Sequence, residues 1–196
     1  MLIRSALRRG CPKKERRYFP MKKLLAMVLA LCLMAGCAMA ADYTWDGVLA
    51  NELSALNANG HFYTLNAAPI RYWLPDAVST YVDPTEDEQE NGHLVACYQN
   101  DDNTMVVLIQ YAETSYQTAD DILAQVNKDS KYTNVNSDTV NGLTAVSYTD
   151  GETGACFALY LLGNGSALQL KLGGFTDDNR LLAAAICWSV MPAEQQ

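Results

Sequence analysis

The chain has 196 residues, of which 49% are hydrophobic, and a formal net charge of −8 at neutral pH. The charge is distributed unevenly: nine of the 14 Lys and Arg residues lie at or before Lys23, whereas 21 of the 22 Asp and Glu residues follow Ala41. The region after Ala41 therefore holds five basic and 21 acidic residues, a formal charge of −16. A field of that sign repels a phosphate backbone, which excludes nucleic acid as an expected partner, and it disfavours binding to anionic lipid.

Residues 21–40 have the composition of a bacterial secretory signal peptide. Met21 is followed by two lysines and then by an uncharged run, Leu24–Ala40. Small residues stand around the expected cut: Ala38, Ala40 and Ala41. The basic residues 1–20 are interpreted as an upstream over-extension of the true start or as an extended basic region. We therefore expect a secreted, extracytoplasmic protein whose leader is removed before Ala41.

The same leader contains a second processing signal. The run Leu33–Cys37 resembles a bacterial lipoprotein box, in which Cys37 is lipidated and becomes the first mature residue. Met34 departs from the Leu, Val or Ile usually found at its position, and no polar tether separates Cys37 from the amphipathic pattern that begins by Trp45. These features favour the secretory cut and leave a membrane-anchored lipoprotein as the alternative. In either case the membrane is reached only through the leader or a lipid anchor.

Residues 41–60 are predicted to form an N-terminal amphipathic helix, and residues 61–196 a single α+β domain. Thr44 is the expected N-cap of that helix, and Asn59-Gly60 supplies its stop. The apolar positions follow helical spacing: Trp45, Val48, Leu49, Leu53 and Leu56.

Short apolar runs separated by turn residues predict a series of β-strands in the domain. Their expected ranges are 61–65, 70–74, 94–99, 105–111, 132–140, 143–149, 155–162 and 167–172. A strand within 77–82 is left open, and the acidic stretch 83–92 is predicted to be a polar loop. Asn141-Gly142 predicts a two-residue hairpin turn. The uninterrupted apolar run Met105–Ile109 predicts a central strand covered on both faces.

Two helices are predicted within the domain. Thr118 is expected to cap the first helix, with Asp121 three residues on as in a capping box. Its apolar face consists of Ala119, Ile122, Leu123 and Val126. Thr176 is expected to cap a closing helix that ends at Pro192, with Asp177-Asp178 near its positive end. The inward residues of that helix are Leu181, Leu182, Ala185, Ile186 and Val190.

The consecutive hairpins predict a mostly antiparallel sheet, and the amphipathic helices need a sheet face to cover. The expected fold class is therefore α+β, with one sheet flanked by helices.

The order of these elements resembles the PsbP-like α/β/α sandwich superfamily. The resemblance rests on four segments: Tyr72–Pro75, the helix opening at 118–121, Val140–Leu143, and Ile186–Ser189. It covers about residues 61–191. The superfamily includes photosystem extrinsic subunits, a Ran-binding nuclear protein and uncharacterised bacterial secreted proteins or lipoproteins, and the chain resembles this last branch. Because members of the superfamily mostly act as binding or accessory proteins, the resemblance implies a non-enzymatic role, although a fold does not fix a function.

The sequence contains no motif that indicates a catalytic centre, a metal site or a cofactor. Cys97, Cys156 and Cys187 are expected either to be unpaired or to include one disulfide, since no pairing follows from their positions. The two histidines, His61 and His93, show no spacing typical of a Cys–His nucleophile or of a zinc site. The acidic loops lack the order of a calcium-binding loop.

The aromatic residues Tyr72, Trp73 and Tyr81 are the candidate binding residues. Aromatic platforms of this kind bind sugars or peptides, although such residues more often fill a core or cover a sheet edge. The leading hypothesis is a non-enzymatic extracytoplasmic binding or accessory domain for an unspecified protein or small ligand. The alternatives are a small secreted hydrolase with acidic catalytic residues and an envelope-anchored structural lipoprotein.

Overall fold

A computed structural model describes residues 42–45, 58–176 and 179–193. These residues all belong to one compact unit, Met39–Gln196. The leader, with both processing signals, lies outside the described residues, and so do residues 46–57 of the predicted N-terminal helix. Within the described ranges, no helix is long and apolar enough to span a membrane.

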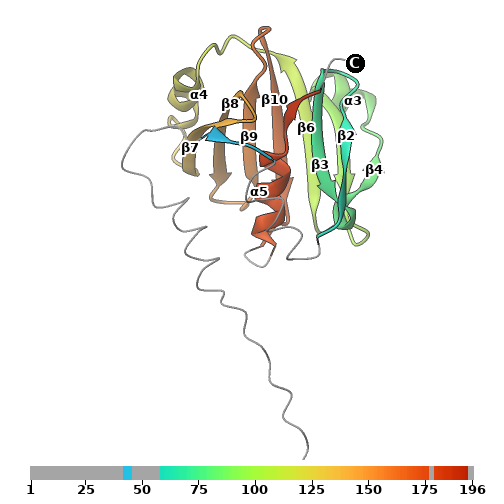
Figure 1. The fold of residues 1–196 in the computed structure, drawn as a ribbon. Helices are drawn as coiled ribbons and strands as arrows, with labels where there is room; N and C mark the ends of the chain where they lie inside the picture. The colour runs from blue at the N-terminus through green and yellow to red at the C-terminus, as the bar shows by residue number, and fades with distance from the viewer. Residues whose placement is uncertain (1–41, 46–57, 177–178, 194–196) are drawn as a thin grey trace, which may run out of the picture. The chain divides into compact units, whose positions relative to one another are not determined.

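Eight strands form the larger sheet, in the order β1-β7-β8-β9-β10-β6-β5-β4 (Figure 1). Their bounds are β1 Asp42–Tyr43, β4 Thr80–Val82, β5 Leu94–Gln99, β6 Val106–Glu113, β7 Tyr132–Val140, β8 Leu143–Asp150, β9 Cys156–Leu161 and β10 Ser166–Gly173. Neighbouring strands are antiparallel except β1 and β7, which are parallel. The predicted fold class, a mostly antiparallel α+β domain, is confirmed.

A smaller sheet has three strands in the order β11-β3-β2. Its bounds are β2 Gly60–Thr64, β3 Ile70–Pro75 and β11 Met191–Pro192, and the helical elements are η1 Asp76–Val78, α3 Glu86–Glu90, α4 Ala119–Val126 and α5 Arg180–Trp188. The expectation of a single sheet is therefore corrected. The β2–β3 hairpin stacks on the larger sheet through its side chains instead of pairing with an edge of that sheet.

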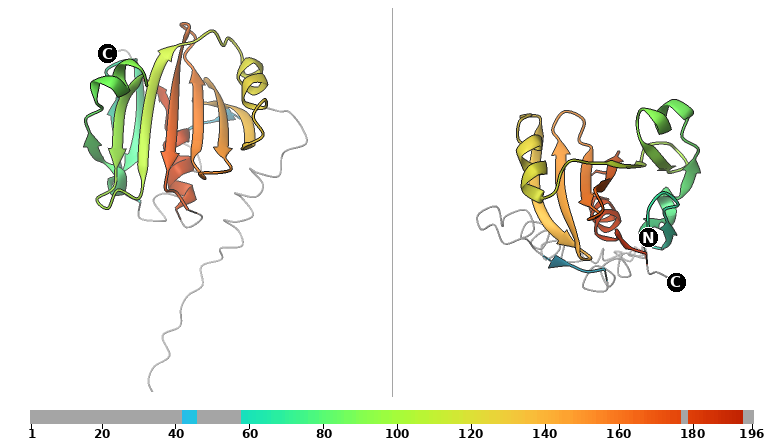
Figure 2. Two further views of the ribbon diagram at one scale, coloured as in Figure 1. Left: turned by 180° about the vertical axis from the view of Figure 1, so that it is seen from behind. Right: turned by 90° about the horizontal axis from the view of Figure 1, so that it is seen from above.

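The larger sheet has a different cover on each face. The helix α5 and the smaller sheet lie on one face, and α4 lies on the other (Figure 2). Strand β10 shows the division, because Leu168, Leu170 and Leu172 are 0%, 0% and 1% exposed on the α5 side. Gln169 and Lys171 alternate with them and are half-buried on the α4 side, as predicted. Burying each leucine contributes about 2 kcal/mol of apolar transfer free energy.

Strand β6 is central, but its two faces are not equally covered. Val107 and Ile109 are fully buried, whereas Val106 and Leu108 are only half-buried. The expectation that both faces are covered is corrected, because α4 packs on β7 and β8 and does not extend over β6. Part of the α4 side of the sheet is consequently open.

The predicted hairpin turn at Asn141-Gly142 is confirmed, with φ angles of 48° and 80°. The Asn141 side chain also joins three segments of the chain. Its Oδ1 accepts the Trp45 N–H at 2.9 Å, and its amide donates to the carbonyls of Trp188 and Val190, both at 2.8 Å. This turn therefore fixes the chain after β1 and the end of α5 against the same corner of the sheet.

Ser189 connects α5 to the smaller sheet. It is fully buried, its Oγ accepts the Trp73 N–H at 2.8 Å, and its hydroxyl donates to the Ile186 carbonyl at 2.7 Å. The chain turns here into β11, so α5 ends at Trp188 rather than at Pro192. The predicted end of the closing helix is thus corrected.

The two helix caps predicted from sequence differ in outcome. At α4, the Thr118 and Asp121 side chains form the predicted capping box. At α5, the residue at the N-cap is Asn179, not Thr176, and its Oδ1 accepts the Thr176 N–H at 2.6 Å. Asn179 makes no side-chain capping bond to the helix, and its amide N–H instead donates to the Met105 sulfur at 3.1 Å.

The stretch 83–92 is not all loop, because α3 occupies Glu86–Glu90. Thr85 and Glu88 form a capping box across its first turn, with the Thr85 N–H donating to Glu88 Oε2 at 2.8 Å. No residue of α3 is buried. The helix therefore has no apolar face, which is why apolar spacing does not predict it.

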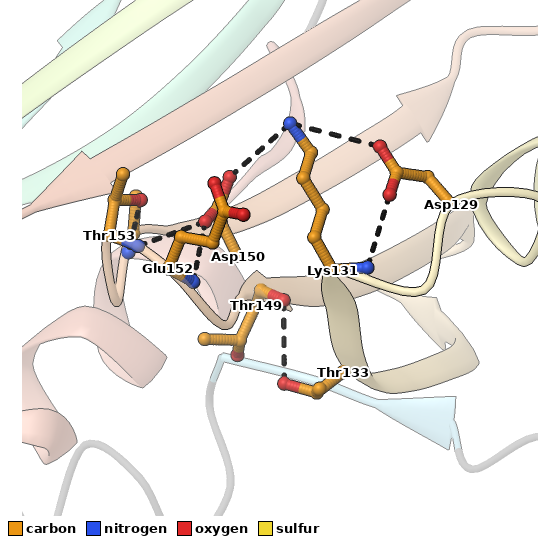
Figure 3. Close-up of polar contacts among 8 residues, drawn as sticks. Asp129, Lys131, Thr133, Thr149, Asp150, Glu152 and Thr153 are labelled. Atoms are coloured by element: carbon orange, nitrogen blue, oxygen red, sulfur yellow. Dashed lines mark hydrogen bonds and ion pairs between the residues drawn. The ribbon is translucent and has the colours of Figure 1, made fainter.

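Asp150, at the end of β8, holds the turn between β8 and β9 (Figure 3). Its Oδ1 accepts the N–H groups of Glu152 and Thr153, both at 2.9 Å. Lys131 Nζ lies 3.6 Å from Asp150 Oδ2 and 3.9 Å from Asp129 Oδ2, and the Asp150 side chain is 10% exposed. The Thr153 N–H, more than the Lys131 charge, holds the pKa of Asp150 below its ordinary value.

We predict that Asp150→Asn destabilises the domain at neutral pH and that this difference from wild type shrinks in acid. Because the folded-state pKa of Asp150 is lowered, its carboxylate stabilises the fold above the unfolded-state pKa of about 4, and the contribution is lost as the pH falls through the folded-state value. Urea unfolding midpoints between about pH 7 and about pH 2 measure the effect. The control is Asp101→Asn, an exposed acid in the turn between β5 and β6. A difference that stays constant across this range would contradict a role of the carboxylate charge.

Candidate functional site

Four tyrosines gather where the smaller sheet meets the edge of the larger one. This tyrosine cluster consists of Tyr63, Tyr72, Tyr81 and Tyr98. Its ring centroids are 6.1 Å apart for Tyr63 and Tyr72, and 5.5 Å apart for Tyr81 and Tyr98. Tyr98 also contacts Tyr63 at 5.5 Å and Tyr72 at 6.1 Å. The cluster is therefore continuous across both sheets.

Strand register explains how the cluster forms. Tyr63 of β2 lies directly opposite Tyr72 of β3, and Tyr81 of β4 lies directly opposite Tyr98 of β5. Directly opposite residues on antiparallel strands point to the same face and pack against each other. Two cross-strand pairs, one from each sheet, thus face each other in the fold.

A buried hydrogen bond joins the two pairs. The hydroxyls of Tyr72 and Tyr98 lie 2.8 Å apart, and either can donate. Burial raises the pKa of Tyr72, and the Tyr98 hydroxyl adds to this effect. Burial also raises the pKa of Tyr98. Both phenols are therefore protonated at neutral pH and act as neutral polar groups.

A hollow with a volume of about 360 Å³ lies beside the cluster. The remaining lining is apolar, and the polar lining comes from Thr64, Asn66, Tyr72, Tyr81, Gln89 and Tyr98. No charged side chain lines the hollow. In a domain with 21 acidic residues after Ala41, this lining disfavours an ion as the ligand and favours a neutral polar molecule.

The structure brings two of the three predicted binding residues together. Tyr72 and Tyr81 both line the hollow, and Tyr81 is 49% exposed at its rim. Trp73 follows Tyr72 on β3 and points to the opposite face, where its ring lies 5.6 Å from that of Trp45. The Trp73 ring also covers Gly60. A glycine is required at position 60, because a Cβ there would collide with the Trp73 ring.

Tyr63 and Tyr98 were not among the predicted site residues. Each lies on a segment predicted to be a strand, but the sequence does not show which residue of another strand lies opposite it. The density of aromatic residues around Pro75 pointed to Tyr72, Trp73 and Tyr81, of which only the two tyrosines belong to the cluster. Tyr63 and Tyr98 join the cluster because strand pairing places them opposite Tyr72 and Tyr81.

The three cysteines of the described residues are unbridged, on β5, β9 and α5. Burial raises the pKa of the Cys187 thiol to about 12 and also raises the pKa of Cys97. Of the histidines, His61 is exposed and lies 3.4 Å from Asp76. In the part of the chain that the structure describes, no three His, Cys, Asp or Glu residues are grouped so that they could hold a metal ion.

The described residues define an α+β domain with mostly antiparallel sheets. No family model and no curated protein matches the chain. Among solved structures, the chain is similar to cyanobacterial PsbP (CyanoP) from Synechocystis sp. PCC 6803, determined in solution. The match has a TM-score of 0.48 and 11% sequence identity, and it covers 68% of this chain and 92% of that chain. PsbP is also the superfamily that the sequence resemblance named, and nothing about function follows from this match.

We predict that Tyr72→Phe and Tyr98→Phe each lower the free energy of unfolding by about 1 kcal/mol, because each leaves the other hydroxyl buried without its partner. The double variant is expected to lose less than the sum of the two, since it removes both hydroxyls together. Urea unfolding of the four proteins measures this coupling, with the exposed Tyr81→Phe as the control. Strictly additive losses would contradict the hydrogen bond between the two hydroxyls.

Proposed function

We propose that this chain is an extracytoplasmic binding module that takes a neutral carbohydrate in the hollow beside the tyrosine cluster. The observation that carries the proposal is the lining itself, which combines three tyrosines with amide side chains and holds no charged group. Tyrosine presents an apolar ring and a polar hydroxyl on one rigid side chain. Such a lining suits a sugar, whose C–H faces pack on rings and whose hydroxyls need neutral hydrogen-bond partners.

The rim of the hollow provides the contacts that the buried tyrosines do not. The ring of Tyr81 packs edge-on against Tyr98 and is half exposed, so it presents a surface for stacking. Asn66 contributes an amide from the loop between β2 and β3. Gln89 of α3 uses its amide N–H on the Pro84 carbonyl at 2.8 Å, which holds the side chain in place and leaves its carbonyl oxygen as an acceptor.

Neither of the two alternative functions has a specific observation in its favour. A hydrolase with acidic catalytic residues needs two carboxylates that converge on a cleft, and no acidic side chain lines this hollow. The structural lipoprotein differs from the secreted module only in the processing of the leader, which lies outside the described residues.

The binding proposal is tested by titrating the folded domain with chitotriose, cellotriose and maltotriose, followed by NMR and calorimetry. At least one of the sugars is expected to shift the tyrosine-cluster resonances. Tyr81→Ala is expected to weaken that binding about three- to tenfold, the worth of one aromatic contact. Phe62→Ala is the matched control, because Phe62 is a similarly exposed aromatic residue (41% against 49%) that adjoins Tyr63 and faces away from the cluster.

Absence of any response at about 10 mM sugar would overturn the carbohydrate assignment. An equal loss in Phe62→Ala would overturn the assignment of the hollow. Shifts at the same resonances caused only by short peptides would keep the site and replace the ligand class.

The proposed location rests on the leader and has its own test. The full chain, expressed in a bacterial host, is expected to yield exported protein whose intact mass begins at Ala41. Ala38→Leu is expected to block this cut, whereas Cys37→Ala leaves it unchanged. A mass that begins at Cys37 and includes acyl groups would establish the lipoprotein instead. Cytoplasmic protein that retains the leader would contradict export.

A further inference from the structure

A second hollow lies on the open face of the larger sheet, beside α4. We call it the α4 groove, and it has a volume of about 370 Å³. The helix α4 that lines it lies on the opposite side of the sheet from α5 (Figure 2). Ile122 and Val126 of α4 form one wall, and Tyr148 and Leu159 of the sheet contribute the floor. The tyrosine cluster does not contribute to this groove.

The floor of the groove is flat and aromatic because of strand register. Tyr148 of β8 lies opposite Phe157 of β9, and their rings stack with centroids 4.9 Å apart and planes 7° apart. Tyr132 of β7 meets Tyr148 edge-on at 4.9 Å. The next residue along this row, Lys171 of β10, lies opposite Phe157, and its ammonium is 5.7 Å from the centre of the Phe157 ring.

Basic residues are scarce in this domain and gather here. Only five Lys and Arg residues follow Lys23. Of these, Lys128 lines the groove, Lys131 lies over the ring of Tyr132, and Lys171 lies over the ring of Phe157. Lys131 is neutralised by Asp129 and Asp150 (Figure 3). Within the described ranges, neither Lys128 nor Lys171 has a carboxylate within ion-pair distance. Lys128 donates only to the neutral Gln125 amide, at 3.0 Å.

The tyrosines of the groove add neutral hydrogen-bond donors. Tyr116, Tyr132 and Tyr148 all line it. Burial, with a smaller contribution from the nearby Tyr132 and Tyr116 phenols, raises the pKa of Tyr148 to about 12. The Tyr148 hydroxyl is therefore protonated at neutral pH. A ligand in the groove thus meets a flat apolar floor, phenolic donors and the Lys128 ammonium, with the Lys171 ammonium beyond Phe157. One carboxylate, Asp129, also lines the groove, and it accepts the Lys131 N–H at 3.1 Å and lies 3.9 Å from Lys131 Nζ.

We propose that the α4 groove binds a small aromatic carboxylate. The flat body of the ligand packs against the Tyr148 and Leu159 floor, and its carboxylate lies beside Lys128 or Lys171. The volume of about 370 Å³ accommodates one or two fused rings. The region after Ala41 as a whole has a formal charge of −16 and repels anions, so the local ammonium groups are what permit the carboxylate to bind.

The test compares 2-naphthoate with its neutral analogue 2-naphthamide, titrated into the folded domain by calorimetry with NMR detection. The acid is expected to bind at least about fivefold more tightly than the amide and to shift resonances of Tyr148 and Leu159. Lys128→Met and Lys171→Met retain the aliphatic stem and remove the charge. At least one of them is expected to weaken naphthoate about threefold or more and to leave naphthamide unchanged.

Arg180→Met is the matched control, since it removes one positive charge at α5, on the other face of the sheet. Thermal unfolding confirms that each variant is folded. Equal binding of acid and amide, or an equal loss in Arg180→Met, would overturn the proposal. Naphthoate binding lost in Tyr81→Ala but retained in both lysine variants would move the ligand to the tyrosine cluster. If the ligand-free domain sediments as a dimer and the groove variants sediment as monomers, the groove is instead a contact between two copies.

Discussion

The alternation of side chains along the strands of the larger sheet is the constraint on which both hollows depend. Even-numbered leucines of β10 face α5 and the smaller sheet, and the residues between them face α4. A shift of one residue in the pairing of β10 with β9 would place Lys171 in the core and Leu170 on the open face. The buried leucines therefore fix the register, and the register in turn fixes which groups line the α4 groove. The side chains exposed on the α4 side are thus determined by the burial of leucines on the α5 side.

The same principle assembles the tyrosine cluster from two separate sheets. Each sheet contributes one directly opposed pair, and the hydrogen bond between Tyr72 and Tyr98 connects them. A buried hydroxyl without a partner costs about 1–3 kcal/mol, so the two sheets are held in one relative position by polar as well as apolar contacts. Ser189 acts in the same direction by joining α5 to β3. The hollow beside the cluster is thus lined mainly by rigid elements rather than by loops.

Sequence patterns predicted most of the strands because their signals are local. The alternation in 167–172, the turn at Asn141-Gly142 and the capping box at Thr118 each lie within a few residues, and the structure confirms all three. The features that sequence missed are not local. The two-residue strand β1 has no period of its own and exists only through its pairing with β7. The third strand of the smaller sheet, β11, likewise exists only because the chain returns to β3. The helix α3 lacks an apolar face, so only its capping box could have indicated it.

The candidate site shows the same division between local and distant information. Tyr72 and Tyr81 could be singled out from the density of aromatic residues, but Tyr63 and Tyr98 are defined by pairing across strands. Trp73 was grouped with Tyr72 because they are adjacent, yet adjacent residues of a strand point to opposite faces. The α4 groove was not predicted at all, because three lysines separated by up to 43 positions come together only through the sheet.

The position of the parallel strand β1 bears on both of the proposed routes of leader processing. It begins at Asp42, one residue after the proposed secretory cut, and it is paired with Thr139 and Val140. A signal peptidase needs its substrate extended and accessible, so pairing of β1 would compete with the proposed cleavage, and that cut would have to precede closure of this edge. In a chain lipidated at Cys37, only four residues would separate the lipid from β1, a reach of at most about 14 Å. Such a short linker would keep the β1 edge at the bilayer surface and would limit the orientations of the domain relative to the membrane.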